Sequence, residues 1–210
     1  MKIHLAAGCT YLEGYINADI SGFVISHDNP KEAYYTDSKS TVYPDKILLY
    51  PDNPNKTDIN HYFKDEWQPD SDKRKLNKRP FIIDKQMNIL KIWSFEDNSV
   101  DELVLISAWE HFWPQQIKEH LIPEVCRVLK PRGKFIVDFP DVIRTVDEYR
   151  NREEEMMILL YCNHASEYAI HHFGYTENTF KKLWPKTYEI KRNDIVKHDY
   201  PMIGMEVVKN

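Results

Sequence analysis

A glycine turn between two short apolar segments opens the chain, and its residue types could bind a ligand. In "KIHLAAGCTYLEGYINADI" a strand from Ile3 to Ala6 leads into a turn of small residues, and a second strand ends at Asp19. Gly8 has no Cβ, so its backbone can turn sharply and lie close to a ligand. The Asp19 carboxylate can accept hydrogen bonds from the two hydroxyls of a ribose. Taken alone, the two residues leave a nucleotide site and an ordinary turn both open.

Three histidines are candidates for proton transfer. His111 follows Glu110 in "WEHF", directly after an apolar run, and His171 and His172 precede "FGYT". Imidazole takes up and releases protons near neutral pH, as a general base must. A structural interpretation stays open for each of them: His111 can orient its loop by hydrogen bonding, and one of the later pair can face the core or cap a surface.

The sequence predicts no metal site. Cys162, His164, His171 and His172 lie close together in the chain, but their spacing matches no standard zinc pattern. The three cysteines of the chain share no motif spacing, which favours free thiols in a reducing cytosol.

The composition of the chain limits the classes of protein to which it can belong. The chain has 210 residues, 42% of them hydrophobic, and a formal net charge of −5. That length predicts one domain, and the charge disfavours a nucleic-acid partner, which would require a basic face. The longest apolar runs, such as "MMILLYC", fall far short of the ~20 residues that span a bilayer. We therefore expect a cytoplasmic protein without a membrane partner, and the oligomeric state stays open.

The elements that must position these residues alternate between strand and helix from Phe81 onward. Apolar runs predict strands in "PFIID", "ELVLIS" and "KFIVDF". Helical spacing is seen in "PQQIKEHLIPEVCRVL", in "DVIRTVDEYRNREEEMMILLYCNHA" and in "YTENTFKKLW", with Asp141 and Thr176 as N-caps. The closing strands, "YEIKRNDIV" and "MIGMEVVK", are expected to pair as an antiparallel hairpin. This alternation predicts an α/β fold with a mostly parallel sheet covered on both faces.

Residues 26–80 break this rhythm. The segment is rich in Pro, Asp, Asn, Tyr and Lys, and only "KILLY" and "DINHYFKDEW" indicate a short strand and a helix. Because its many aromatic residues argue against disorder, we interpret it as an insertion that packs on a single domain spanning residues 1–210. It is a candidate lid or acceptor-binding element.

A ligand of such a sheet is expected beyond the carboxyl ends of its strands. Three strand ends qualify, at residues 6–8, 107–110 and 138–141.

An ordered series of motifs resembles the class I S-adenosylmethionine-dependent methyltransferases, of the short kind in small-molecule and glycan pathways. "HLAAGCTYLEGYINADI" is similar to the family's opening, and "FEDNSVDELVLISAWEHF" to its "FPDNSFDxVxxSHVLEHL". "IPEVCRVLKPRGKFIVDFPDV", "HHFGYTENTFKKL" and "MEVVKN" are similar to the later motifs in the same order. The resemblance covers residues 1–20 and about 81–208 and implies a three-layer Rossmann-like methyltransferase fold.

The resemblance also implies a cofactor site for S-adenosylmethionine. It assigns the methionine part of the cofactor to Leu5, Ala6, Ala7, Gly8 and Cys9, and the ribose to Asp19. It assigns the adenine to Met87, Asn88 and Ile89, with Asn88 replacing the usual Asp as an acceptor. Ser107, Ala108 and Trp109 are placed beside the sulfonium, where Trp109 could offer a π face; core filling is the alternative for this tryptophan.

Three departures from the family pattern stand out. Thr10 occupies the position of the second motif glycine, and almost no room is left for the helix that usually follows the turn. Support of the cofactor carboxylate by a helix dipole should therefore be weak. Arg132 replaces a glycine of the "KPGG" turn, which is tolerated only if that position has no positive φ.

The predicted function is methyl transfer from S-adenosylmethionine to a small-molecule or sugar-containing acceptor. A general base is needed only if that acceptor is a hydroxyl or a protonated nitrogen. Two alternatives stay open. One is a non-catalytic methyltransferase-like binding module. The other is an NAD-dependent Rossmann oxidoreductase or epimerase, which the missing G-x-G-x-x-G and Tyr-x-x-x-Lys signatures disfavour.

Overall fold

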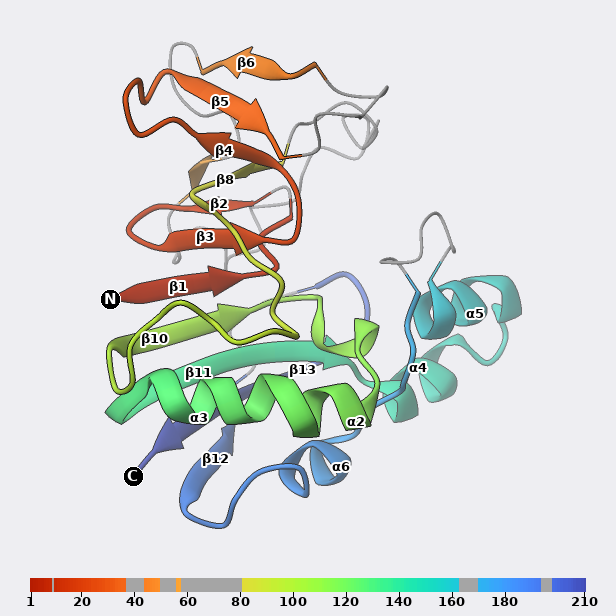
Figure 1. Ribbon diagram of the computed structural model, residues 1–210. Helices are drawn as coiled ribbons and strands as arrows, with labels where there is room; N and C mark the ends of the chain where they lie inside the picture. The colour runs from red at the N-terminus through yellow and green to blue at the C-terminus, as the bar shows by residue number, and fades with distance from the viewer. Residues whose placement is uncertain (9, 37–43, 50–55, 58–80, 163–169, 194–197) are drawn as a thin grey trace. The chain divides into compact units, whose positions relative to one another are not determined.

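Strands joined by turns make up the first part of the chain, and strands alternating with helices make up the second (Figure 1). The structure is a computed structural model, which describes residues 1–8, 10–36, 44–49, 56–57, 81–162, 170–193 and 198–210. The chain divides into two units, Met1–Ile89 and Leu90–Asn210, which are described separately.

Three parallel strands organise the first unit. They are β1 (Lys2–Leu5), β3 (Ile16–Asp19) and β9 (Lys85–Gln86). Ile3 aligns with Ile16 across β1 and β3, and Ala18 aligns with Lys85 across β3 and β9. The described residues between β1 and β3 contain only the two-residue strand β2 (Tyr11–Leu12), which pairs with β7 (Lys56–Thr57). As the sequence predicted, no helix follows the glycine turn among these residues.

A second, four-stranded sheet contains two strands of the 26–80 segment, β5 (Glu32–Tyr35) and β6 (Lys46–Leu48). Its strands, in spatial order, are β6, β5, β4 (Phe23–Ile25) and β8 (Ile82–Ile83). The side chains of Phe23, Ala33, Leu49 and Ile82 form a small buried core of their own. The predicted strands in "KILLY" and "PFIID" are confirmed, and the predicted helix at residues 58–67 lies outside the described residues.

The second unit alternates strand and helix. Its strands are β10 (Val100–Leu105), β11 (Leu129–Pro140), β12 (Tyr188–Arg192) and β13 (Met202–Lys209). Its helices are the 3₁₀ turn η3 (Trp109–His111), α2 (Pro114–Gln116), the π turn η4 (Ile117–Leu121), α3 (Ile122–Val128), α4 (Val142–Tyr149), α5 (Glu153–Tyr161) and α6 (Glu177–Lys181). The predicted helix over residues 141–165 is therefore two helices, which are separated at residues 150–152.

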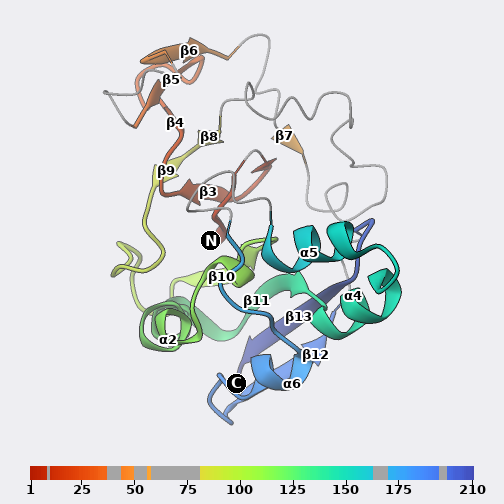
Figure 2. The ribbon, with the colours of Figure 1, turned by 90° about the vertical axis from the view of Figure 1, so that its right-hand side faces the viewer.

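The segment from α2 to α3 is one helical run along β10 and β11 (Figure 1). The apolar side chains that the sequence placed on its inner face are fully buried: Ile117, Leu121, Val125, Val128 and Leu129. Pro123 lies in the first turn of α3, just after the π turn, where proline is tolerated because its missing N–H is not needed there. Helices α4 and α5 lie on the other side of β11 from α2 (Figure 2), which gives this unit helices on both faces.

The strand directions confirm the predicted fold class. Strand β10 runs parallel to β11, with Leu103 opposite Phe135, whereas β13 runs antiparallel to both β11 and β12. The chain thus has an α/β Rossmann-like fold whose strands are mostly parallel, with an antiparallel strand pair at the C-terminus. Among the described residues, no helix is both long and apolar enough to cross a membrane.

The two predicted helix caps are confirmed, whereas the turn at Arg132 does not meet the condition that the sequence analysis set for it. The Asp141 side chain accepts a hydrogen bond from Arg144 N at the start of α4, and Thr176 Oγ1 accepts one from Thr179 N at the start of α6. Arg132 has φ +64°, so its turn does require the left-handed backbone that the family's glycine would adopt. Arginine there is strained, by about 1–2 kcal/mol.

Candidate functional site

The turn after β1 is held open by left-handed backbone and by hydrogen bonds to β3. Ala6 has φ +48° and Gly8 has φ +55°. Ala7 N donates to Ala18 O at 3.1 Å, and Thr10 N donates to Ala7 O at 3.0 Å. Among the described residues, a Cβ on Gly8 would meet only Ala6 O, 4.0 Å away. Backbone conformation therefore explains this glycine, and the described residues leave the space beside it open to a ligand.

Asp19, the last residue of β3, is tied directly to that turn. Its Oδ2 accepts a hydrogen bond from Gly8 N at 2.8 Å, and its Oδ1 accepts one from Ile20 N at 2.6 Å. Burial raises the pKa of this carboxyl, and the backbone N–H groups of Gly8, Ile20 and Ser21 oppose that rise. The glycine turn and the strand-end acid that the sequence singled out are therefore one hydrogen-bonded unit.

A buried asparagine, which sequence reasoning did not single out, fixes the shape of this loop. Asn17 Oδ1 accepts a hydrogen bond from Leu12 N at 2.7 Å, and Nδ2 donates to Leu12 O and Tyr15 O. Asp84 Oδ2 accepts from Asn17 N at 2.8 Å, and His4 Nδ1 lies 3.1 Å from Asn17 Oδ1. The only signal for Asn17 was its place in "YINADI", next to the predicted ribose acid.

The donor set of the first unit fits S-adenosylmethionine. Met87 N donates to Asp19 O at 2.7 Å, so the segment after β9 is anchored beside the strand-end acid. Met87 and Ile89 are buried, and Asn88 between them is partly exposed. Apolar flanks with one amide suit an adenine, and a carboxylate suits a ribose diol. Of the first-unit residues assigned to the cofactor, Cys9 lies outside the described residues.

In the second unit, the residues after β10 form a strained turn braced by β11. Ser107 has φ +50°, and its N–H donates to Asp138 Oδ1 at 2.6 Å. Asp138 Oδ2 lies 2.7 Å from His198 Nε2. A non-glycine residue with left-handed backbone is uncommon and is enriched at functional sites. Sequence reasoning placed Ser107 and Asp138 at two strand ends and missed His198.

Glu110 is a buried carboxyl in the same region. Burial raises its pKa to about 8, and the Asp138 carboxylate pushes the pKa in the same direction. Its Oε2 atom is buried and has no hydrogen-bond partner among the residues that the structure describes. Burial and the Glu110 and Asp138 carboxylates also raise the pKa of Tyr200. Such clusters of perturbed acids are typical of functional sites.

The structure brings His111 and His171 together. Their ring centroids are 5.0 Å apart, and His171 Nε2 lies 3.8 Å from Glu110 Oε1. Burial lowers the pKa of His111. Burial, and to a smaller extent the neighbouring His111, lowers the pKa of His171 to about 4. Both imidazoles are therefore neutral at pH 7. Glu110 is largely protonated there, so the 3.8 Å contact is not an ion pair of charged groups. His172 stacks instead on Trp113, with ring centroids 4.9 Å apart.

Trp109 lies in the aromatic core. Its side chain is fully buried, and its ring packs against those of Phe135, Tyr175, Phe180 and Trp184 at centroid distances of 5.0–6.4 Å. The core-filling alternative therefore describes its side chain, and the π face that the resemblance offered to the sulfonium is taken up by these neighbours. Ala108 is buried as well, whereas Ser107 is partly exposed.

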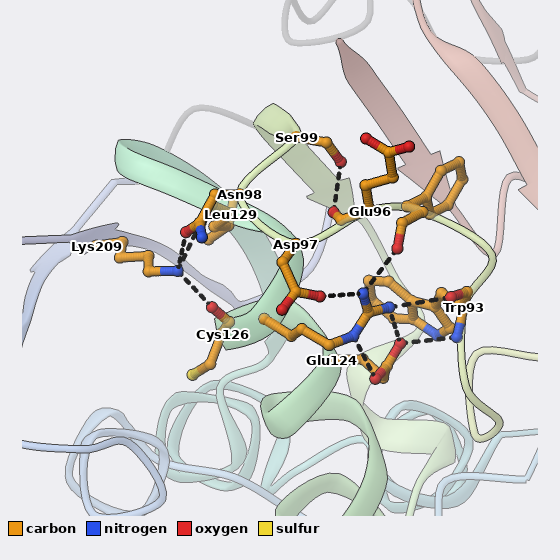
Figure 3. Close-up of polar contacts among 11 residues, drawn as sticks. Trp93, Glu96, Asp97, Asn98, Ser99, Glu124, Cys126, Leu129 and Lys209 are labelled. Atoms are coloured by element: carbon orange, nitrogen blue, oxygen red, sulfur yellow. Dashed lines mark hydrogen bonds and ion pairs between the residues drawn. The ribbon is translucent and has the colours of Figure 1, made fainter.

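Two of the motifs that carry the sequence resemblance, "FEDNS" and "RVLKPRG", have a structural role (Figure 3). Arg127 donates to both oxygens of Glu124, to Asp97 Oδ1 at 2.8 Å, and to the carbonyls of Phe95 and Trp93. The residues of "FEDNS" and "RVLKPRG" thus hold the loop before β10 against α3. These motifs mark the fold and supply no group to the chemistry described above.

Comparison with known proteins gives one family match. Residues 56–137 match the model of a family described as a methyltransferase domain. This stretch is less than half of the chain; it begins inside the 26–80 segment and excludes the glycine turn. The match supports a methyltransferase that uses S-adenosylmethionine. No curated protein matches the chain.

Three solved structures are similar to this chain at low identity. The PH0226 protein from Pyrococcus horikoshii OT3 is 16% identical, with 100% of this chain and 83% of that chain covered and a TM-score of 0.45. An S-adenosylmethionine-dependent methyltransferase from Methanosarcina mazei is 15% identical, with 99% and 89% covered and a TM-score of 0.43. A possible histamine N-methyltransferase from Thermotoga maritima is 14% identical, with 67% and 69% covered and a TM-score of 0.38. The fold assignment rests on the strand directions of this chain and not on these likenesses.

Proposed function

We propose that this protein transfers a methyl group from S-adenosylmethionine to a small-molecule or sugar-containing acceptor. The observation that carries the proposal is the 2.8 Å hydrogen bond from Gly8 N to Asp19 Oδ2. It joins a glycine turn with open space beside it to a carboxylate at the end of a parallel strand. That pairing is the arrangement a nucleoside ligand requires. The methyltransferase family match supports this choice of nucleoside.

The residues of the first unit would hold the cofactor. Asp19 would accept from the ribose hydroxyls, Asn88 would accept from the adenine amino group, and Gly8 would let the backbone approach the methionine part. When bound, S-adenosylmethionine supplies a methyl group already activated on a sulfonium. The protein then needs chiefly to align the acceptor and to exclude water.

Proton removal is the one further task, and it arises only for a hydroxyl or protonated-nitrogen acceptor. His111, His171 and His172 are the predicted proton acceptors, on the ground of their position at the end of β10 and before Tyr175. The segment 26–80 remains our candidate for a lid or acceptor-binding element. A cytoplasmic location and a sugar-containing acceptor are likewise parts of the proposal.

A thermal-shift comparison tests the proposal. S-adenosylhomocysteine, the product form of the cofactor, should raise the unfolding temperature, and NAD should not. A ligand at 100 times its Kd adds about 2.7 kcal/mol to the free energy of unfolding. A shift with NAD alone would favour the oxidoreductase alternative. S-adenosylhomocysteine binding without turnover on hydroxyl, amine and sugar acceptors would favour the binding module.

Asp19→Ala is the discriminating variant and Asp28→Ala its matched control. Both remove one aspartate from the first unit, but the Asp28 side chain is fully exposed. Because Asp19 also accepts from Gly8 N, the ligand-induced shift of each variant is measured from its own ligand-free unfolding temperature. We expect the shift to vanish in Asp19→Ala and to persist in Asp28→Ala; equal shifts would refute the ribose assignment.

A further inference from the structure

Two neighbouring residues of the second unit, Glu110 and His111, converge with His171, which is distant from them in sequence. Glu110, His111 and His171 each offer one ligand atom, and these atoms all lie within 4.8 Å of one another. One carboxylate and two imidazoles form a donor set that first-row transition metals prefer. Sequence reasoning missed this set, because the cluster considered there grouped His171 with Cys162, His164 and His172 instead.

Backbone contacts hold the two segments together. His172 N donates to Glu110 O at 2.8 Å, and His111 Nδ1 lies 3.0 Å from Ile170 O. The latter contact, made with Nδ1 protonated, leaves the lone pair of His111 on Nε2. Metal-binding histidines are oriented in this way, by a hydrogen bond from the ring nitrogen that does not bind the metal.

The cluster is incomplete as it stands. Glu110 is 3% exposed, and its Oε2 atom has no hydrogen-bond partner within the described part of the chain. Its other oxygen, Oε1, lies 3.8 Å from His171 Nε2, which is too far for a hydrogen bond. Two metal–ligand bonds of about 2.0–2.2 Å span up to about 4.2 Å, so an ion between these atoms fits the separation. A buried carboxyl oxygen without a partner is costly, and a cation would satisfy it.

We propose that Glu110, His111 and His171 bind one divalent transition-metal ion of the Zn²⁺ class. The two nitrogen donors select against Mg²⁺, which prefers oxygen ligands and keeps its waters. The Asp138 carboxylate lies close enough to Glu110 to interact with it, and this negative charge favours a cation. Three protein ligands leave a coordination position for water or for an oxygen of the acceptor. The site does not depend on the proposed methyl transfer; with the ion bound, only His172 of the three histidines is left as a proton acceptor.

Titration of the metal-free, tag-free full-length protein with Co²⁺ tests the site directly. Co²⁺ reports its own coordination through visible absorption, so binding is read without any enzymatic activity. We expect one Co²⁺ per chain, its displacement by an equivalent of Zn²⁺, and no displacement by millimolar Mg²⁺. If the unaltered protein shows no absorption band and no saturable Zn²⁺ binding by calorimetry, the proposal is wrong, whatever the variants do.

Two ligand variants and one control locate the ion. Glu110→Gln and His171→Gln should each weaken Co²⁺ binding by about tenfold or more, which is at least the effect of disturbing a group behind a ligand. His120→Gln removes an exposed histidine of η4 in the same unit and should leave the affinity unchanged. Glu110→Gln keeps the shape of the side chain, so its ligand-free unfolding temperature should match that of the unaltered protein. If the unaltered protein and the three variants bind Co²⁺ with equal affinity, the ion lies elsewhere and the assignment is refuted.

Discussion

Replacing Arg127 by methionine should destabilise the second unit by about 3 kcal/mol. The guanidinium spans Glu124, Asp97 and two backbone carbonyls, with donor–acceptor distances of 2.7–3.0 Å. The side chains of Arg127 and Glu124 are only 27% and 12% exposed, whereas that of Asp97 is 70% exposed. The first pair therefore dominates the expected loss.

The expected loss of stability follows from the Glu124 charge that the substitution leaves without its partner. Removing one partner of a buried ion pair costs about 3–5 kcal/mol, because the other charge stays buried. Solvent reaches part of this pair, which places the loss at the lower end. The exposed contact to Asp97 adds less than about 1 kcal/mol. Glu124 keeps its hydrogen bond from Trp93 N at 2.7 Å, which limits the penalty further.

Urea unfolding followed by tryptophan fluorescence measures the loss as a lower midpoint with an unchanged slope. Lys130→Met is the matched control. Its partner Asp101 lies 2.7 Å away, but the two side chains are 42% and 52% exposed, so its loss should stay below about 1 kcal/mol. If Arg127→Met and Lys130→Met lose equal stability, the motif does not hold the loop before β10, and the structural interpretation of the resemblance fails.

Two further predictions concern backbone strain and acid stability. Arg132→Gly should raise the free energy of unfolding by about 0.5–1 kcal/mol in the same urea assay, because it relieves a residue at φ +64°. Gly133→Ala should lower the free energy of unfolding, since a Cβ there would meet Lys130 O at 2.9 Å. A gain in Gly133→Ala or a loss in Arg132→Gly would contradict this account of the turn. Burial lowers the pKa of His4 from 6.5 to about 4, so the unfolded chain binds the proton first and stability should fall by about 3 kcal/mol as the pH drops from 6.5 to 4. His4→Gln should flatten that pH dependence, and an unchanged slope would show that His4 does not cause it.

The elements of the second unit were largely predictable, because local patterns determine them. The apolar run at Leu103–Ile106 is bounded by turn residues, and the stripe from Ile117 to Leu129 has helical spacing; both proved buried. Asp141 and Thr176 were recognisable as caps because the N-cap interaction spans only three residues. The break between α4 and α5 was not predictable in this way, since residues 150–152 include no proline or glycine.

The candidate site likewise has one part that local sequence patterns predict and another part that they do not. Gly8 and Asp19 lie within one strand–turn–strand unit, so their pairing followed from local reasoning. The convergence of Glu110, His111 and His171 depends on the fold bringing residue 171 beside residue 111, which no local pattern encodes. The same holds for His198 beside Asp138 and for Asp84 beside Asn17. The role of Trp109 was ambiguous because an aromatic side chain suits a core and a cation alike.

In the proposed function, Asp19 holds the ribose of the cofactor and the glycine turn holds its methionine part. A crystal structure of the protein with S-adenosylhomocysteine tests it most directly. We expect the ribose hydroxyls within hydrogen-bond distance of the Asp19 carboxylate, and the methionine part beside Gly8. Density for the ligand at any other place, with Asp19 bonded only to Gly8 N and Ile20 N, would contradict the account.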